Sequence, residues 1–75
     1  MRADVVDILS QVFRVPAESL EESSSPDSIA TWDSLSHLEM IAALESRFGL
    51  RFNMREIQTM DTPERIEAVL DTHEC

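Results

Sequence analysis

With 75 residues, the chain is long enough for one small hydrophobic core and too short for a second. Fifteen acidic residues stand against six basic ones, all arginine, and the net charge is −9 at pH 7. This charge argues against binding to nucleic acid or to anionic membranes, and it favours protein partners with basic patches. The alternative is that the acidity only keeps a small protein soluble.

Disulfides and structural metals are not expected to stabilise this fold. Cys75 is the only cysteine and the last residue, so no intramolecular disulfide can form, and we expect no role for it beyond adventitious dimers. Cys75, His37 and His73 lack metal-ligand spacing. No apolar run approaches the roughly 20 residues of a membrane span, and the N-terminus is too acidic for a secretory signal. Since the chain starts with Met1, we expect a complete cytoplasmic protein.

The first predicted helix covers residues 3–14. Its apolar residues recur with helical spacing at Val5, Ile8, Leu9 and Val12. Pro16 disfavours the helical conformation at Val15 and so ends the helix. A long connection without periodicity follows over residues 16–32. We expect the apolar residues Leu20, Ile29 and Trp32 to anchor this connection to the helices.

The second predicted helix starts near Ser34 and ends at Gly49, the only glycine, which serves as a left-handed C-cap. Two adjoining stripes make a broad apolar face, one with Leu35, Leu38 and Ala42, the other with His37, Met40, Ile41, Leu44 and Phe48. From this breadth we expect it to be the most buried helix.

Two further helices follow. Asn53 and Glu56 have the spacing of a capping box, which predicts a short helix over residues 54–59. Asp61 or Thr62 then caps a last helix with Pro63 in its first position. Strand signals are nearly absent. The sequence therefore predicts an all-α protein, a small bundle of three main helices and one short one with a long loop after the first, and one domain over residues 1–75.

Ser34 stands at the start of the second helix, where three roles are open. As a nucleophile it would need a base and an oxyanion hole, but the G-x-S-x-G motif is absent, and nothing in the sequence orients His37. We therefore expect no catalytic activity. As a cap it would compete with Thr31, Asp33 and Ser36. Ser36 and Glu39 also have capping-box spacing. Thirdly, a phosphate attached to Ser34 by another enzyme would lie at the positive end of the helix.

The stretch DSLSHLEMIAALESRFGLRF, from Asp33 to Phe52, resembles the core motif of acyl carrier proteins. The helix order, the long loop, the length and the negative charge fit the same family over essentially the whole chain. The resemblance implies that Ser34 carries 4′-phosphopantetheine, installed from coenzyme A by a phosphopantetheinyl transferase. It implies that Asp33 is the neighbouring acidic residue and that Leu35 packs the start of the helix.

The resemblance also implies docking on the second helix by loading and processing enzymes with basic patches. Glu39 and Glu45 would present carboxylates to these enzymes. The alternative, that the two glutamates only form a solvated helix face, is equally compatible with the sequence. Met40 is a further candidate contact, but we favour a core position for it, together with Ile41 and Leu44. In carriers of fatty acyl chains that core can open to hold the chain.

Two features differ from typical fatty-acid carriers, namely the absence of glycine before D-S-L and the presence of Arg47. With these differences, the sequence resembles a specialised stand-alone carrier of a polyketide, secondary-metabolite or cell-envelope pathway. A peptidyl or aminoacyl carrier and an unmodified acidic interaction domain remain open alternatives. We expect a monomer, and we expect Trp32 to anchor the loop rather than to contact the prosthetic arm.

Overall fold

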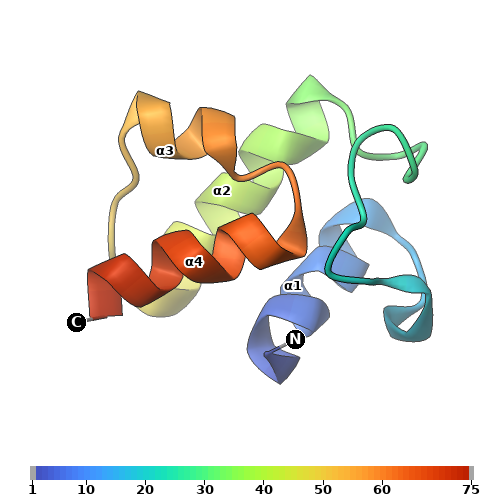
Figure 1. Cartoon of the computed structure of the whole chain (residues 1–75), viewed down its shortest axis with the longest axis horizontal. Coiled ribbons are helices and arrows are strands. Elements are labelled where there is room, and N and C mark those ends of the chain that lie inside the picture. Colours follow the sequence, from blue (N-terminus) through green and yellow to red (C-terminus); the bar gives the residue numbers. More distant parts are fainter. Residues whose placement is uncertain (1, 75) are drawn as a thin grey trace.

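A computed structural model describes residues 2–74 of the chain. Its helices are α1 (Ala3–Phe13), the short 3-10 helix η1 (Ala17–Ser19), α2 (Ser34–Phe48), α3 (Met54–Thr59) and α4 (Pro63–Glu74). The described residues contain no strand. Figure 1 shows α4 crossing in front of α2, with α3 on one side of the molecule and the long connection on the other. The predicted all-α bundle is confirmed, and η1 is an addition that the sequence did not suggest.

The helix ends follow local signals. Gly49 ends α2 with φ 64°, and its N–H donates to the carbonyl of Glu45, as expected for a left-handed cap. Arg14 ends α1 in the same conformation, with φ 57°, although its side chain makes that region unfavourable. Asn53 and Glu56 form the predicted capping box of α3. At α4, the Thr62 hydroxyl accepts from the N–H of Arg65 at 3.2 Å, so Thr62 caps the helix.

The core lies between the helices, and α1 and α2 pack together most extensively. Its fully buried side chains are Val5, Leu9, Phe13, Met40, Leu44, Met60, Ile66 and Leu70. Only one of the two apolar stripes predicted for α2 enters it, the stripe with Met40, Ile41 and Leu44. Leu35 and Leu38 are 69% and 58% exposed. The prediction that α2 is buried over a broad face is therefore wrong, because its other stripe points away from the neighbouring helices.

The long connection is anchored as predicted, since Leu20, Ile29 and Trp32 are all buried. Thr31 ties the connection to α1 because its hydroxyl donates to the carbonyl of Phe13. Near its middle, the Glu22 carbonyl accepts from the N–H of Glu64 at the start of α4, at 3.3 Å. Hydrogen bonds and apolar contacts thus hold the connection between two helices.

Between residues 2 and 74, no helix has both the length and the apolar character that crossing a membrane requires. Over the same part of the chain, no cluster of three or more His, Cys, Asp or Glu residues has the arrangement of a metal site. The expectation for Cys75 lies outside the described residues.

Candidate functional site

Ser34 is the first residue of α2, and Asp33 is the residue that caps it. A carboxylate oxygen of Asp33 accepts from the N–H of Ser36 at 2.8 Å. Ser34 is exposed, and no hydrogen bond joins its hydroxyl to any other residue that the structure describes. The capping reading of Ser34 is therefore unnecessary, because the neighbouring aspartate satisfies the helix start. Thr31 and Ser36, the other candidates, also do not cap α2.

Asp33 remains charged at neutral pH. The backbone N–H of Ser36 donates to its carboxylate and holds the pKa below the ordinary value of 3.8. The Ser36 hydroxyl acts in the same direction. A charged carboxylate also interacts favourably with the positive end of a helix. Asp33 thereby stabilises the backbone that presents the Ser34 hydroxyl.

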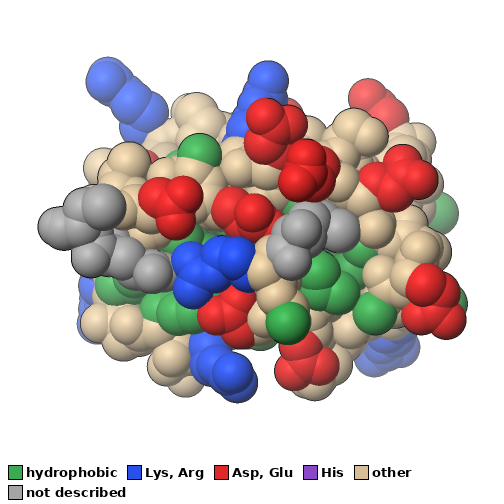
Figure 2. Space-filling view, turned by 60° about the horizontal axis from the view of Figure 1, so that its bottom comes forward, with side chains coloured by type: hydrophobic (Ala, Val, Ile, Leu, Met, Phe, Trp, Pro, Cys, Tyr) green, Lys and Arg blue, Asp and Glu red, His purple; other side chains and the backbone are tan. Residues whose placement is uncertain are grey.

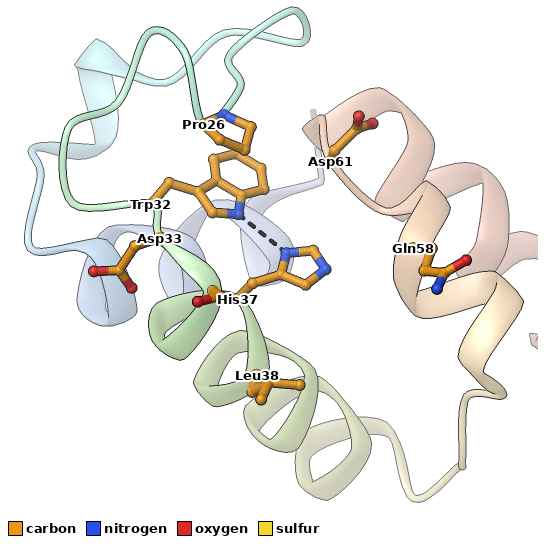
Figure 3. A pocket seen from close by; sticks show the side chains of 8 residues that line it. Pro26, Trp32, Asp33, His37, Leu38, Gln58 and Asp61 are labelled. Carbon is orange, nitrogen blue, oxygen red and sulfur yellow. Dashed lines mark hydrogen bonds between the residues drawn. The ribbon is translucent and has the colours of Figure 1, made fainter.

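A groove of about 500 Å³ lies beside Ser34. Its lining residues are Pro26, Trp32, Asp33, Ser34, His37, Leu38, Gln58 and Asp61. Figure 3 shows Pro26 and Trp32 on one side, Gln58 and Asp61 on the opposite side, and His37 and Leu38 along α2. The loop, the start of α2, and the segment from α3 to α4 therefore meet around this groove. Its surface is mostly apolar, with a few polar groups, as in many ligand-binding grooves.

Trp32 and His37 form a hydrogen-bonded pair at this groove. The indole N–H donates to His37 Nδ1 at 3.1 Å (Figure 3). His37 Nε2 lies 2.8 Å from the carbonyl of Ile57 in α3. Because an indole N–H can only donate, Nδ1 must accept and Nε2 carries the hydrogen that Ile57 receives. Both ring nitrogens are thus engaged away from Ser34, and His37 is not placed to act as its base.

This pair was not predicted from the sequence, in which nothing indicated that His37 is oriented. A tryptophan directly before a helix cap and a histidine one turn inside the helix are the signal that could have found it. The choice of Ile57 as the second partner has no sequence signal, because it depends on where α3 docks. Gln58 and Asp61 were missed for the same reason, since they reach the groove only through tertiary packing.

The other predicted residues of α2 fall into different environments. Leu35 was expected to pack the helix start, but it is 69% exposed. Glu39 is exposed, as a docking residue must be. Glu45 is half-buried, and its carboxylate accepts from the N–H of Phe52 at 2.9 Å, so it stabilises the turn after α2. Met40 has no exposed surface and belongs to the core, which contradicts its assignment as a partner contact in this conformation.

The residues around Ser34 fit a phosphopantetheine group. The hydroxyl is exposed and unpaired among the described residues, so it is accessible to a modifying enzyme. A phosphodiester on it would lie at the positive end of α2, which favours negative charge. The apolar groove begins at the same residue and offers a surface to whatever is attached there. Asp33, Trp32 and Leu38 would border the attached group.

Comparisons with known proteins identify the family and the fold of the chain. The sequence profile of the phosphopantetheine attachment site matches residues 3–70. No curated protein sequence matches the chain. Among solved structures, the holo acyl carrier protein from Geobacter metallireducens, determined by solution NMR, is similar with a TM-score of 0.81 and 29% sequence identity. The match covers 92% of this chain and 79% of that one. The chain therefore belongs to the phosphopantetheine-attachment family, with the fold of acyl carrier proteins.

Proposed function

We propose that Ser34 is the attachment residue of this carrier protein and that the chain presents acyl groups to partner enzymes. The observation that supports this most directly is the exposed Ser34 hydroxyl at the first turn of α2, freed from capping by Asp33. The cofactor of the family is 4′-phosphopantetheine, whose terminal thiol holds an acyl group as a thioester. The chain itself fixes the attachment point, supplies the helix terminus next to the phosphodiester and offers the groove. It has no catalytic role of its own.

The docking surface proposed for partner enzymes is the outer face of α2. Glu39 is exposed there, and Leu35 and Leu38 add apolar area beside the attachment residue. Enzymes with a basic patch around a small apolar centre would be complementary to it. These enzymes include a phosphopantetheinyl transferase and the enzymes that load and process the cargo.

The cargo and the setting belong to the same proposal. The absence of glycine before Asp33 and the presence of Arg47 support a specialised stand-alone carrier of a polyketide or other specialised pathway. A peptidyl or aminoacyl cargo would use the same serine. We propose further that residues 1–75 act as one carrier domain, as a monomer in the cytoplasm.

The first prediction tests the attachment residue. Purified unmodified protein is incubated with coenzyme A and a broad-specificity phosphopantetheinyl transferase, and its intact mass is measured. We expect a gain of one phosphopantetheine that maps to the Ser34 peptide. Ser34→Ala should abolish the gain, while Ser36→Ala, which removes a hydroxyl two residues further into α2, should still allow modification. Circular dichroism should show the same helical content in all three proteins.

A Ser34→Ala variant that is still modified would move the site to another residue. A folded wild-type protein that stays unmodified with this transferase and with further phosphopantetheinyl transferases would favour the alternative of an unmodified acidic interaction domain. Both results can be interpreted because circular dichroism checks that each protein is folded before modification.

A further inference from the structure

Trp32 lies between the groove beside Ser34 and the hydrophobic core. Its indole lines the groove, yet only 3% of the residue is exposed. On the core side, its ring stacks on Phe13 of α1 with a centroid distance of 4.5 Å and an angle of 24° between the planes. Phe13 has no exposed surface. The indole is therefore the wall that separates the groove from the buried side chains.

His37 holds this wall in place. It accepts the indole hydrogen bond and is itself bound to the Ile57 carbonyl, so the indole is linked to both α2 and α3. The ring of His37 is also stacked near the indole, with planes 20° apart. Phe13 adds α1 to the same arrangement. Rotating the indole away would break a stacking contact and leave a buried N–H without a partner, which is unfavourable.

The groove has an evident occupant. Ser34 lines it, so a group tethered to this residue stays at high local concentration beside an apolar surface. From this arrangement, and resting on the proposed function, we infer that Trp32 and His37 confine the acyl group to the surface groove and exclude it from the core. The pair thereby determines specificity for cargo length. Short acyl groups are protected by the groove, and longer chains extend from it into solvent.

The first part of the test uses the unmodified protein, so it does not depend on loading. Trp32 is the only tryptophan, and quenching of its fluorescence by acrylamide therefore reports the state of this wall alone. His37→Leu removes both hydrogen bonds of the ring, whereas His37→Gln keeps an acceptor and a donor. We expect a quenching constant at least about twofold higher in His37→Leu, and a value near wild type in His37→Gln. Equal quenching in all three proteins would overturn the role of His37.

The second part uses protein loaded on Ser34. A transferase moves the acyl-phosphopantetheine of an acyl-coenzyme A to the serine oxygen, and adenosine 3′,5′-bisphosphate leaves with the serine proton. Acetyl, butyryl and octanoyl forms are confirmed by mass, and their Tm values are compared. In the wild-type protein we expect butyryl to raise Tm over acetyl and octanoyl to add nothing further. In His37→Leu, octanoyl should raise Tm beyond butyryl because the core becomes accessible.

Trp32→Phe provides a second variant if His37→Leu does not fold. It keeps an aromatic ring beside Phe13 but removes the indole donor and reduces the size of the ring, and it should show the same gain with octanoyl. A wild-type Tm that continues to rise from butyryl to octanoyl would overturn the inference. Failure of the mass to change on loading would instead contradict the proposed function, so the two failures are distinguishable.

Discussion

Asp33 and Ser34 divide two tasks at the start of α2. The aspartate accepts from the N–H of Ser36 and stabilises the first turn, and the serine hydroxyl stays unpaired among the described residues. If Ser34 were the cap, its oxygen would bind backbone N–H groups and would be less available for modification. The adjacent pair therefore allows a stable helix start and an exposed hydroxyl in the same turn.

The charge of Asp33 predicts a pH dependence of stability. Its pKa is lowered in the folded protein by the N–H of Ser36, so its stabilising effect is fully present above the ordinary value of 3.8 and is lost as the pH falls through the lowered folded pKa. Asp33→Asn still caps the helix but does not titrate. We expect wild type to lose more Tm than Asp33→Asn on acidification from pH 5 to pH 3.

Thermal melts followed by circular dichroism at several pH values make this comparison. Parallel losses of Tm in the two proteins would show that the Asp33 charge does not contribute. Asp33→Ala, which removes the cap as well, should melt a few degrees below both at neutral pH.

At the site, the sequence could single out Ser34 as a candidate attachment residue but not the division of roles between Asp33 and Ser34. Thr31, Asp33, Ser34 and Ser36 all have side chains suited to a helix start. Which of them caps depends on the residue at which the helix begins, and sequence signals do not fix that position to one residue. The contact between His37 and the Ile57 carbonyl could not be predicted for a different reason, because it depends on how α3 docks against α2.

At the scale of the helix, α2 uses its two glutamates differently. Glu39 is exposed, whereas Glu45 accepts from the N–H of Phe52. Helical spacing could not distinguish these two roles, because a glutamate has the same place in the sequence pattern whether its carboxylate faces solvent or binds the following turn. Caps and apolar spacing were sufficient to predict the helix bounds. They did not predict the exposure of Leu35 and Leu38, because periodicity does not reveal which apolar stripe packs against a neighbouring helix.

The two glutamates form a matched pair for a charge-reversal test. Glu39→Lys should slow phosphopantetheine transfer several-fold at low salt, with a smaller effect at higher salt, and it should leave Tm nearly unchanged. Glu45→Lys should lower the free energy of unfolding by about 1 kcal/mol, since the N–H of Phe52 loses its acceptor. Transfer rates at several ionic strengths and thermal melts test both. A Glu39→Lys rate equal to wild type at all ionic strengths would remove Glu39 from the docking surface.

At the scale of the whole molecule, the acidic charge opposes the compact state. Figure 2 shows Asp and Glu side chains spread over the visible face with arginines scattered among them. The net charge of −9 on 75 residues implies repulsion between many exposed carboxylates. Ion pairs offset part of it, such as the 2.7 Å contact between Arg65 and Asp61.

Salt should therefore stabilise this protein. Between ionic strengths of about 0.01 M and 0.15 M the Debye length falls from about 30 Å to about 8 Å, which screens repulsion across the surface. We expect Tm to rise by several degrees over this range in sodium chloride. A Tm that falls instead would mean that the few ion pairs outweigh the repulsion. Scanning calorimetry at constant pH distinguishes the two outcomes.

The anchored connection between α1 and α2 also bears on how the chain folds. These two helices share the most extensive packing, yet residues 14–33 separate them in sequence. Bringing them together requires closing a long loop, and its entropy must be lost before the contacts between Phe13, Trp32 and α2 are gained. The buried residues of the connection can contribute only once that loop has closed. The folding rate should thus be limited by a late, non-local docking step, while the individual helices form and dissolve much faster.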